Sequence, residues 1–180
     1  MPNDTRKTTT KRTAKARQYQ AEPAGLADVA EIAELLLHYS QMGNLLARNQ
    51  ADIEQYIDNF YVIREPSENT PDKPTKKRAV IACGALEHFS EELVEIRSLV
   101  VNPKHHGNGL GRILVERLID LAKHRQAKRV MALTYSVGFF EKLGFIVVDK
   151  AIFPEKIWGV CISCYKFKNC DETAVLLTLP

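Results

Sequence analysis

The sequence lacks any apolar run close to the roughly 20 residues that a membrane-spanning helix needs. Its charged start also lacks the apolar core of a signal peptide. It has only four cysteines, and with no sign of secretion a disulfide framework is not expected. These absences predict a cytoplasmic protein without a membrane partner. What is present is ordinary, because 180 residues, 45% hydrophobic and 26% charged, fit one globular domain with its own core.

Positive charge is concentrated at the start of the chain. The net charge is +3, but residues 1–20 carry six basic side chains and one acidic one, a local charge of +5 that leaves −2 for the rest. Because this segment shows no apolar periodicity, we expect residues 1–17 to be a basic disordered tail in front of a domain at 18–180. Nucleic acid is not an expected partner, although a targeting or nucleic-acid role of the tail stays open as the alternative.

Apolar periodicity and turn residues divide the domain into helices and strands. Helices are predicted at residues 27–39, 50–59, 110–124 and 137–143, and strands at 18–23, 60–64, 79–86, 93–101, 129–134, 145–149 and 173–179. Consecutive strands imply antiparallel pairing, and the later strand–helix–strand unit implies a parallel crossover. The expected fold is α/β (α+β), a mixed central sheet flanked by helices. Residues 65–78 hold three prolines and are predicted to form a surface loop.

A glycine-rich turn joins the strand at 93–101 to the helix at 110–124. Glycines here let backbone N–H groups converge, and the helix start adds the positive end of its dipole, a combination that binds phosphate. A P-loop is excluded because Gly-Lys-Ser/Thr is missing, and a dinucleotide fingerprint is excluded because Arg112 stands where a third glycine is needed. A turn without any ligand is the remaining alternative.

The turn reads His106-Gly107-Asn108-Gly109-Leu110-Gly111 and resembles motif A of the GCN5-related N-acetyltransferases (GNAT). His106 departs from the usual Arg or Gln, which matters little if backbone amides bind the phosphates. Phe140-Glu141-Lys142-Leu143-Gly144-Phe145 is similar to that family's Tyr-x-x-x-Gly-Phe ending. The resemblance implies the GNAT fold and acetyl-CoA as the acetyl donor, with no metal required for the chemistry.

Within the family, the chain most resembles the acetyltransferase domain of N-acetylglutamate synthases, in their short, stand-alone bacterial form. The blocks that carry this likeness are 43–48, 95–101, 132–135, 153–158 and the cysteines with the acidic pair at 171–172. It implies acetylation of the α-amino group of L-glutamate, the first step of arginine biosynthesis. Alternatives are another amino acid, a small amine, a protein N-terminus or a non-catalytic acyl-CoA-binding module. A homodimer stays open, and the arginine site that longer synthases carry in another domain is expected to be missing.

Strand alternation places Glu95 and Arg97 on one face of the strand at 93–101, next to the glycine turn. A carboxylate and a guanidinium there suit an acceptor that carries an ammonium and a carboxylate, and Glu95 is the candidate general base. A surface ion pair within the strand is the alternative. The family's usual acid is a tyrosine at the place of Phe140, which cannot donate a proton, so Tyr135 and Ser136 are the candidate substitutes.

The remaining binding residues follow from the turn and the resemblance. The predicted cofactor-binding residues are Leu99, Val100, Val101, His106, Gly107, Asn108, Gly109, Leu110, Gly111, Arg112 and Phe140. Because glutamate carries two carboxylates, its pocket should supply cationic groups, for which Arg48, Arg97 and Lys156 are the candidates.

Three of the four cysteines lie within ten residues, as Cys161-x-x-Cys164-x5-Cys170. A C-x-x-C pair can chelate zinc, but strong zinc sites usually add a second pair or histidines. Free thiols that pack a loop are therefore preferred to a metal, with Cys161, Cys164 and Cys170 kept as the alternative, structural metal ligands. Cys83 stands apart in a core strand and is expected to serve packing rather than covalent catalysis.

Overall fold

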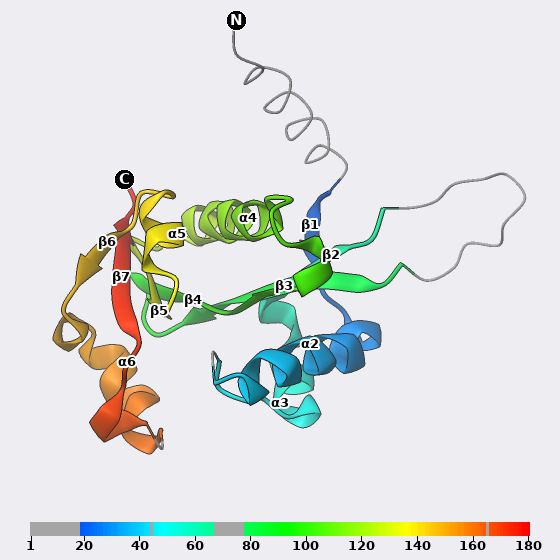
Figure 1. The fold of residues 1–180 in the computed structure, drawn as a ribbon. Coiled ribbons are helices and arrows are strands. Elements are labelled where there is room, and N and C mark those ends of the chain that lie inside the picture. Colours follow the sequence, from blue (N-terminus) through cyan, green and yellow to red (C-terminus); the bar gives the residue numbers. More distant parts are fainter. Residues whose placement is uncertain (1–18, 44, 67–77, 165) are drawn as a thin grey trace, which may run out of the picture. The chain divides into compact units, whose positions relative to one another are not determined.

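The computed structural model describes residues 19–43, 45–66, 78–164 and 166–180 (Figure 1). The predicted basic tail at 1–17, the first residue of the strand predicted at 18–23 and residues 67–77 of the predicted loop lie outside the described residues. Within the described part of the chain, no helix is long and apolar enough to cross a membrane.

Among the residues that the structure describes, seven strands form one mixed sheet in the order β1-β2-β3-β4-β5-β7-β6. The strands are β1 Ala21–Pro23, β2 Phe60–Arg64, β3 Val80–His88, β4 Leu93–Val101, β5 Arg129–Thr134, β6 Ile146–Val148 and β7 Thr173–Thr178. β4 pairs with β5 in parallel, whereas β1–β2, β5–β7 and β6–β7 pair antiparallel. The predicted mixed sheet with a parallel crossover is thus confirmed.

Helices occupy the connections. They are α2 Val29–Gln41, α3 Gln50–Gln55, α4 Leu110–His124, α5 Val137–Glu141 and α6 Pro154–Gly159, with 3-10 turns η1 Leu26–Asp28, η2 Ile57–Asn59, η3 Pro103–His105, η4 Lys150–Ile152, η5 Cys161–Ser163 and η6 Phe167–Asn169. The single helix predicted at 50–59 is wrong in its second half, because Tyr56 leaves helical geometry (φ −115°, ψ 23°) and a 3-10 turn follows. The long connection at 149–172 contains α6, which the sequence reasoning did not predict.

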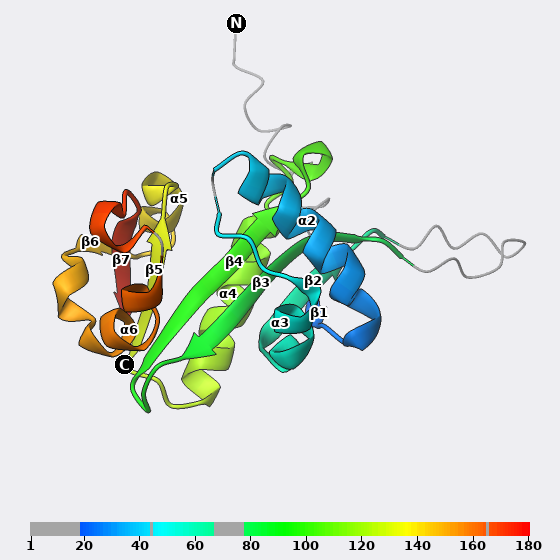
Figure 2. The same ribbon diagram turned by 90° about the horizontal axis from the view of Figure 1, so that it is seen from below.

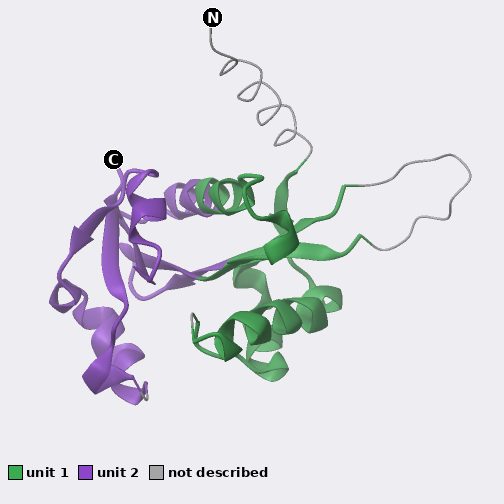
Figure 3. Cartoon of the chain, in the orientation of Figure 1, with its two compact units in different colours: residues 1–84, 98–117 green, residues 85–97, 118–180 purple. Residues whose placement is uncertain are grey.

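The described residues divide into two compact units. Those within 1–84 and 98–117 form the first, and those within 85–97 and 118–180 form the second (Figure 3). In the first unit, α2 and α3 cover one face of β2 and β3, and the beginning of α4 lies on the other face (Figures 1 and 2). Its interior includes Ile32, Leu36, Phe60 and Ile63, all fully buried. In the second unit, β7 lies between β5 and β6.

Cys83 is fully buried on β3, and its thiol lies 3.7 Å from the carbonyl oxygen of Ser98. Burial raises the pKa of the Cys83 thiol to about 12 because a thiolate would lose its hydration there. At neutral pH the group is therefore a thiol that fills the core, as its position beside Gly84 predicts.

Candidate functional site

The turn between β4 and α4 is built around two glycines with left-handed backbone angles. Gly107 has φ +77° and Gly109 has φ +80°, a region that other residues adopt only with strain. A Cβ atom added at either glycine would meet no protein atom within 4 Å, so the surface above the turn is open. Since the first N–H groups of α4 have no partner within the helix, the turn can present them to a phosphate.

Hydrogen bonds hold the beginning of this turn. The Asn102 side chain accepts from the backbone N–H of Lys104 at 3.0 Å, and the Asn108 side chain donates to the carbonyl of His105 at 3.0 Å. Val100 and Leu110 are buried, whereas His106, Gly107, Gly109 and Arg112 are exposed. The buried residues anchor both ends of the turn, and the exposed ones form its accessible surface.

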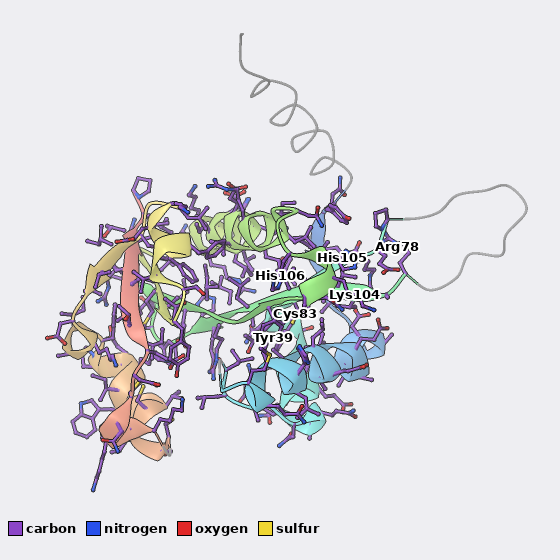
Figure 4. The ribbon with its side chains drawn as sticks, in the orientation of Figure 1. Tyr39, Arg78, Cys83, Lys104, His105 and His106 are labelled. Atoms are coloured by element: carbon purple, nitrogen blue, oxygen red, sulfur yellow. The ribbon has the colours of Figure 1, made fainter. Side chains whose placement is uncertain are left out.

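His106 takes part in a small polar cluster with Tyr39 of α2 (Figure 4). The Tyr39 hydroxyl donates to the carbonyl of Val101, and His106 Nε2 lies 2.8 Å from that carbonyl and 2.8 Å from the hydroxyl. Partial burial raises the pKa of Tyr39, so the hydroxyl keeps its proton at neutral pH. His106 therefore ties the turn to α2 and to the end of β4, a connection that the sequence did not reveal.

Ser98 interrupts the regular geometry of β4 with φ +54°, a left-handed angle for a residue other than glycine. Such an angle within a strand is costly and marks a local distortion of the kind seen at bulges. Regular alternation along residues 93–101 was the expectation. Residues 93–96 are all buried, and burial alternates only in the second half of the strand, where Ser98 is buried between the half-buried Arg97 and Leu99. Sequence carries no signal for this residue.

Glu95 forms a buried ion pair with Lys156 of α6. Lys156 Nζ lies 2.7 Å from Glu95 Oε2, and the two side chains are only 7% and 3% exposed. The ammonium group also lies 5.2 Å from the centre of the Phe89 ring, a cation–π distance. Lys156 was expected among the acceptor-binding cations, but the structure gives it Glu95 as its partner.

Each of the two candidate arginines has an acidic partner of its own. Arg97 donates to Glu87 of β3, and Arg48 donates to Asp52 one helical turn further along the chain. The Arg48 side chain is 7% exposed, with its guanidinium 5.4 Å from the centre of the Phe60 ring. A surface pair within β4 was the alternative interpretation, and in the structure Glu95 contacts Lys156 while Arg97 contacts Glu87. The pair of Arg48 and Asp52 could have been predicted, because the two residues are four positions apart in sequence.

Tyr135 lies in an exposed polar cluster after β5. Its hydroxyl donates to Asp171 at 2.6 Å and accepts from Lys166 at 2.9 Å. The hydrogen bond to Asp171 raises the pKa of Tyr135, so the phenol stays protonated at neutral pH. Ser136 is also exposed, and its backbone N–H donates to Thr134.

Phe140 lies in the interior, 4% exposed, and stacks edge to face on Phe145 with ring centres 5.1 Å apart. It was predicted to contact the cofactor, and in the structure its ring packs in the core.

The three clustered cysteines are free thiols. Burial raises the pKa of Cys161, with Glu95, Cys170 and Cys164 adding to the effect and Lys156 opposing it. Among the residues that the structure describes, no three His, Cys, Asp or Glu side chains gather into an arrangement that could hold a metal ion.

Comparisons with known proteins all match this chain to acetyltransferases. The profile of the Acetyltransferase (GNAT) family matches residues 31–145. An uncharacterized N-acetyltransferase of Chlorobaculum tepidum is 34% identical over 87% of this chain and 94% of its own length. An amino-acid acetyltransferase of Mycobacterium tuberculosis is 32% identical over 70% of this chain and 67% of its own length.

Solved structures give the same result for the fold. A Mycobacterium tuberculosis protein in complex with CoA superposes with a TM-score of 0.72 at 29% identity, over 89% of this chain and 99% of that one. The N-acetylglutamate synthase of Neisseria gonorrhoeae, complexed with coenzyme A and N-acetyl-glutamate, superposes with a TM-score of 0.76 at 23% identity. That match covers 90% of this chain and 35% of the synthase, and it shows similarity of fold alone.

Proposed function

We propose, on the premise that the chain belongs to the acetyltransferase (GNAT) family, that it moves an acetyl group from acetyl-CoA to the α-amino group of an amino acid, with L-glutamate as the expected acceptor. The observation that carries the proposal is a strand, β4, that bears the buried carboxylate Glu95 and leads into the open glycine turn. The name of the Mycobacterium tuberculosis relative supports an amino-acid acceptor.

The turn fits the donor substrate. Acetyl-CoA carries a pyrophosphate, and the glycine turn offers left-handed residues, open space above them and the start of a helix. We assign pyrophosphate binding to the backbone of Gly107–Gly111. His106 then serves to hold the turn through Tyr39 and Val101 rather than to supply a permanent charge.

Acetyl transfer needs a neutral amine, so the acceptor ammonium must lose a proton before its nitrogen attacks the thioester carbon. Glu95 is assigned as the base that takes this proton, directly or through one water. The new C–N bond forms as the C–S bond breaks, and the thiolate of CoA leaves with the bonding electrons. The nitrogen releases its second proton to solvent as the amide forms. Tyr135, whose raised pKa keeps it protonated, is the candidate donor of a proton to that thiolate.

The acceptor carboxylates are assigned to Arg48 and Arg97. Each guanidinium already contacts one protein carboxylate, but five N–H donors allow a guanidinium to bind a second anion. The protein partners hold the two arginines in fixed orientations before substrate arrives, which lowers the entropic cost of binding. Glutamate is expected to be acetylated in preference to polyamines, because a polyamine carries no carboxylate for the two arginines to bind.

The test is release of CoA thiol from acetyl-CoA with a panel of glutamate, glutamine, aspartate, other amino acids, a model peptide and a polyamine. The expected result is turnover with glutamate and little with polyamine. Glu95→Gln should lower turnover by about two to four orders of magnitude, which is the usual contribution of a general base. Arg97→Ala and Arg48→Ala should raise the KM for glutamate, while Arg125→Ala, an exposed arginine after α4, serves as the control. Turnover of the polyamine alone would refute an amino-acid acceptor.

A further inference from the structure

The helix α6 is attached to the second unit at three nearly consecutive residues. Phe153, just before the helix, is 1% exposed and belongs to a core cluster with Leu93, Met131 and Ala174 of three different strands. Glu155 accepts from Arg129 of β5 at 2.8 Å. Lys156 reaches Glu95 of β4 at 2.7 Å. With Phe153 in the core and Glu155 fixed on β5, the Lys156 side chain is held against β4.

The burial of both charges makes the Lys156–Glu95 pair unlike a surface ion pair. Removing a carboxylate and an ammonium from water is unfavourable, and hydrophobic residues would stabilise such a position at least as well. A pair retained at 3% and 7% exposure therefore calls for a role other than stability. On the same strand, Arg97 is paired with Glu87 of β3.

We propose that Lys156 is a positioning residue for Glu95, which rests on the role of Glu95 in the proposed function. The ammonium fixes the buried Glu95 side chain through Oε2, so the carboxylate keeps Oε1 for the proton of the acceptor. Phe89 limits the movement of the ammonium through the cation–π contact. The segment 149–172 thus brings the Lys156 ammonium to the catalytic strand.

Other titratable groups act on the same neighbourhood. Glu172, just before β7, has its pKa raised by burial and then by Glu95, and lowered by Lys156. Cys161 of η5 responds to the same two groups. Because these groups are electrostatically coupled, a change in pH dependence belongs to the cluster rather than to one residue. The test below therefore combines pH dependence with two readouts that do not depend on pH.

The kinetic test compares Lys156→Met, Lys156→Arg and Lys168→Met. Lys168 is an exposed lysine in the same segment and serves as the matched control. Lys156→Met should lower kcat at least 100-fold with the KM for acetyl-CoA within about twofold of wild type. It should also move the acid limb of kcat/KM to higher pH, since Lys156 lowers the pKa of the neighbouring Glu172 in the coupled cluster and the variant removes that effect. Lys156→Arg should restore part of kcat, and Lys168→Met should behave as wild type. A raised KM for glutamate with unchanged kcat and pH profile would show Lys156 to be a carboxylate binder and overturn the proposal.

A double-mutant cycle separates this inference from the proposed function. Unfolding by urea is measured for Glu95→Gln, Lys156→Met and the double variant, where the proposal expects each single change to destabilise and the double variant to be more stable than the sum predicts. The double variant leaves no unpaired buried charge, so it should fold even if Lys156→Met does not. Additive effects would overturn the pair. If the cycle shows coupling but wild-type protein acetylates no amino acid, the proposed function fails and the pair stands as a structural one.

Discussion

Replacement of Gly109 by valine gives a direct test of the turn between β4 and α4. Gly109 has φ +80°, and a Cβ atom there would meet no protein atom within 4 Å. The expected effect is therefore conformational rather than steric within the protein. An L-residue in the left-handed region is disfavoured by about 1–2 kcal/mol, and a β-branched side chain lies at the upper end.

This conformational penalty should lower either the free energy of unfolding or the affinity for acetyl-CoA. If the variant keeps the left-handed angle in the free protein, the free energy of unfolding falls by about 1–2 kcal/mol. If the free turn relaxes instead, acetyl-CoA must restore the angle on binding, and the same energy raises its Kd about 5- to 30-fold. The valine methyl groups would also occupy the open space where the pyrophosphate is expected, so the Kd should rise in both cases.

Isothermal titration with CoA and urea unfolding measure the two quantities on the same protein. Gly138→Ala is the matched control, since Gly138 is also exposed and open but lies within α5 without a positive φ. It should leave the Kd unchanged and, because alanine suits a helix better, raise stability by up to about 1 kcal/mol. A wild-type Kd in Gly109→Val combined with lower stability would refute the cofactor role of the turn, and no change in either quantity would refute its geometry as well.

Three further changes test other parts of the structure. Tyr39→Phe removes the hydroxyl that contacts Val101 and His106, so unfolding free energy should fall by about 1 kcal/mol and the Kd for CoA should rise a few-fold by calorimetry. Glu172→Gln should raise the melting temperature at neutral pH. A raised folded pKa means that ionised Glu172 destabilises the fold, so the gain should shrink as pH falls through that pKa, and an equal gain at acidic pH would contradict the assignment. Thiol reagents at neutral pH should leave Cys83 unlabelled in native protein and label it after denaturation, as mass spectrometry would show, because burial holds the thiol protonated.

Much of the fold could be predicted because its central elements have strong apolar periodicity. The predicted bounds of residues 60–64, 93–101, 110–124 and 129–134 coincide with β2, β4, α4 and β5. The sequence reasoning failed where elements are short. The helix predicted at 50–59 divides into α3 and η2, and α6 was missed although Pro154 occupies its first turn, a common helix start.

In the candidate site, too, features built from residues adjacent in sequence could be predicted, whereas contacts between residues distant in sequence could not. The glycine turn was predictable since its function depends on residues adjacent in sequence. The pairing of Glu95 with Lys156 joins residues 61 positions apart, and the partner of Arg97 lies on another strand. No local spacing indicates such partners, because they are chosen by how strands and helices pack. The sequence thus identified the charged side chains of the site but not the oppositely charged residues that pair with them.

The connection between β6 and β7 is the feature that links fold and site most closely. The two strands pair directly, with Ile146 opposite Leu176 and Val148 opposite Ala174, so a hairpin of about 2–5 residues would be the common way to join them. Instead residues 149–172 intervene, and ordering such a segment is opposed by conformational entropy. The segment is held by Phe153 in the core and by Lys150, which donates to the carbonyl of Cys170 near the other end. A hairpin would preserve the register of β6 and β7 but would not bring Lys156 to Glu95. The long connection supplies the ammonium that contacts Glu95, so the variants of Lys156 test what this segment contributes to the site.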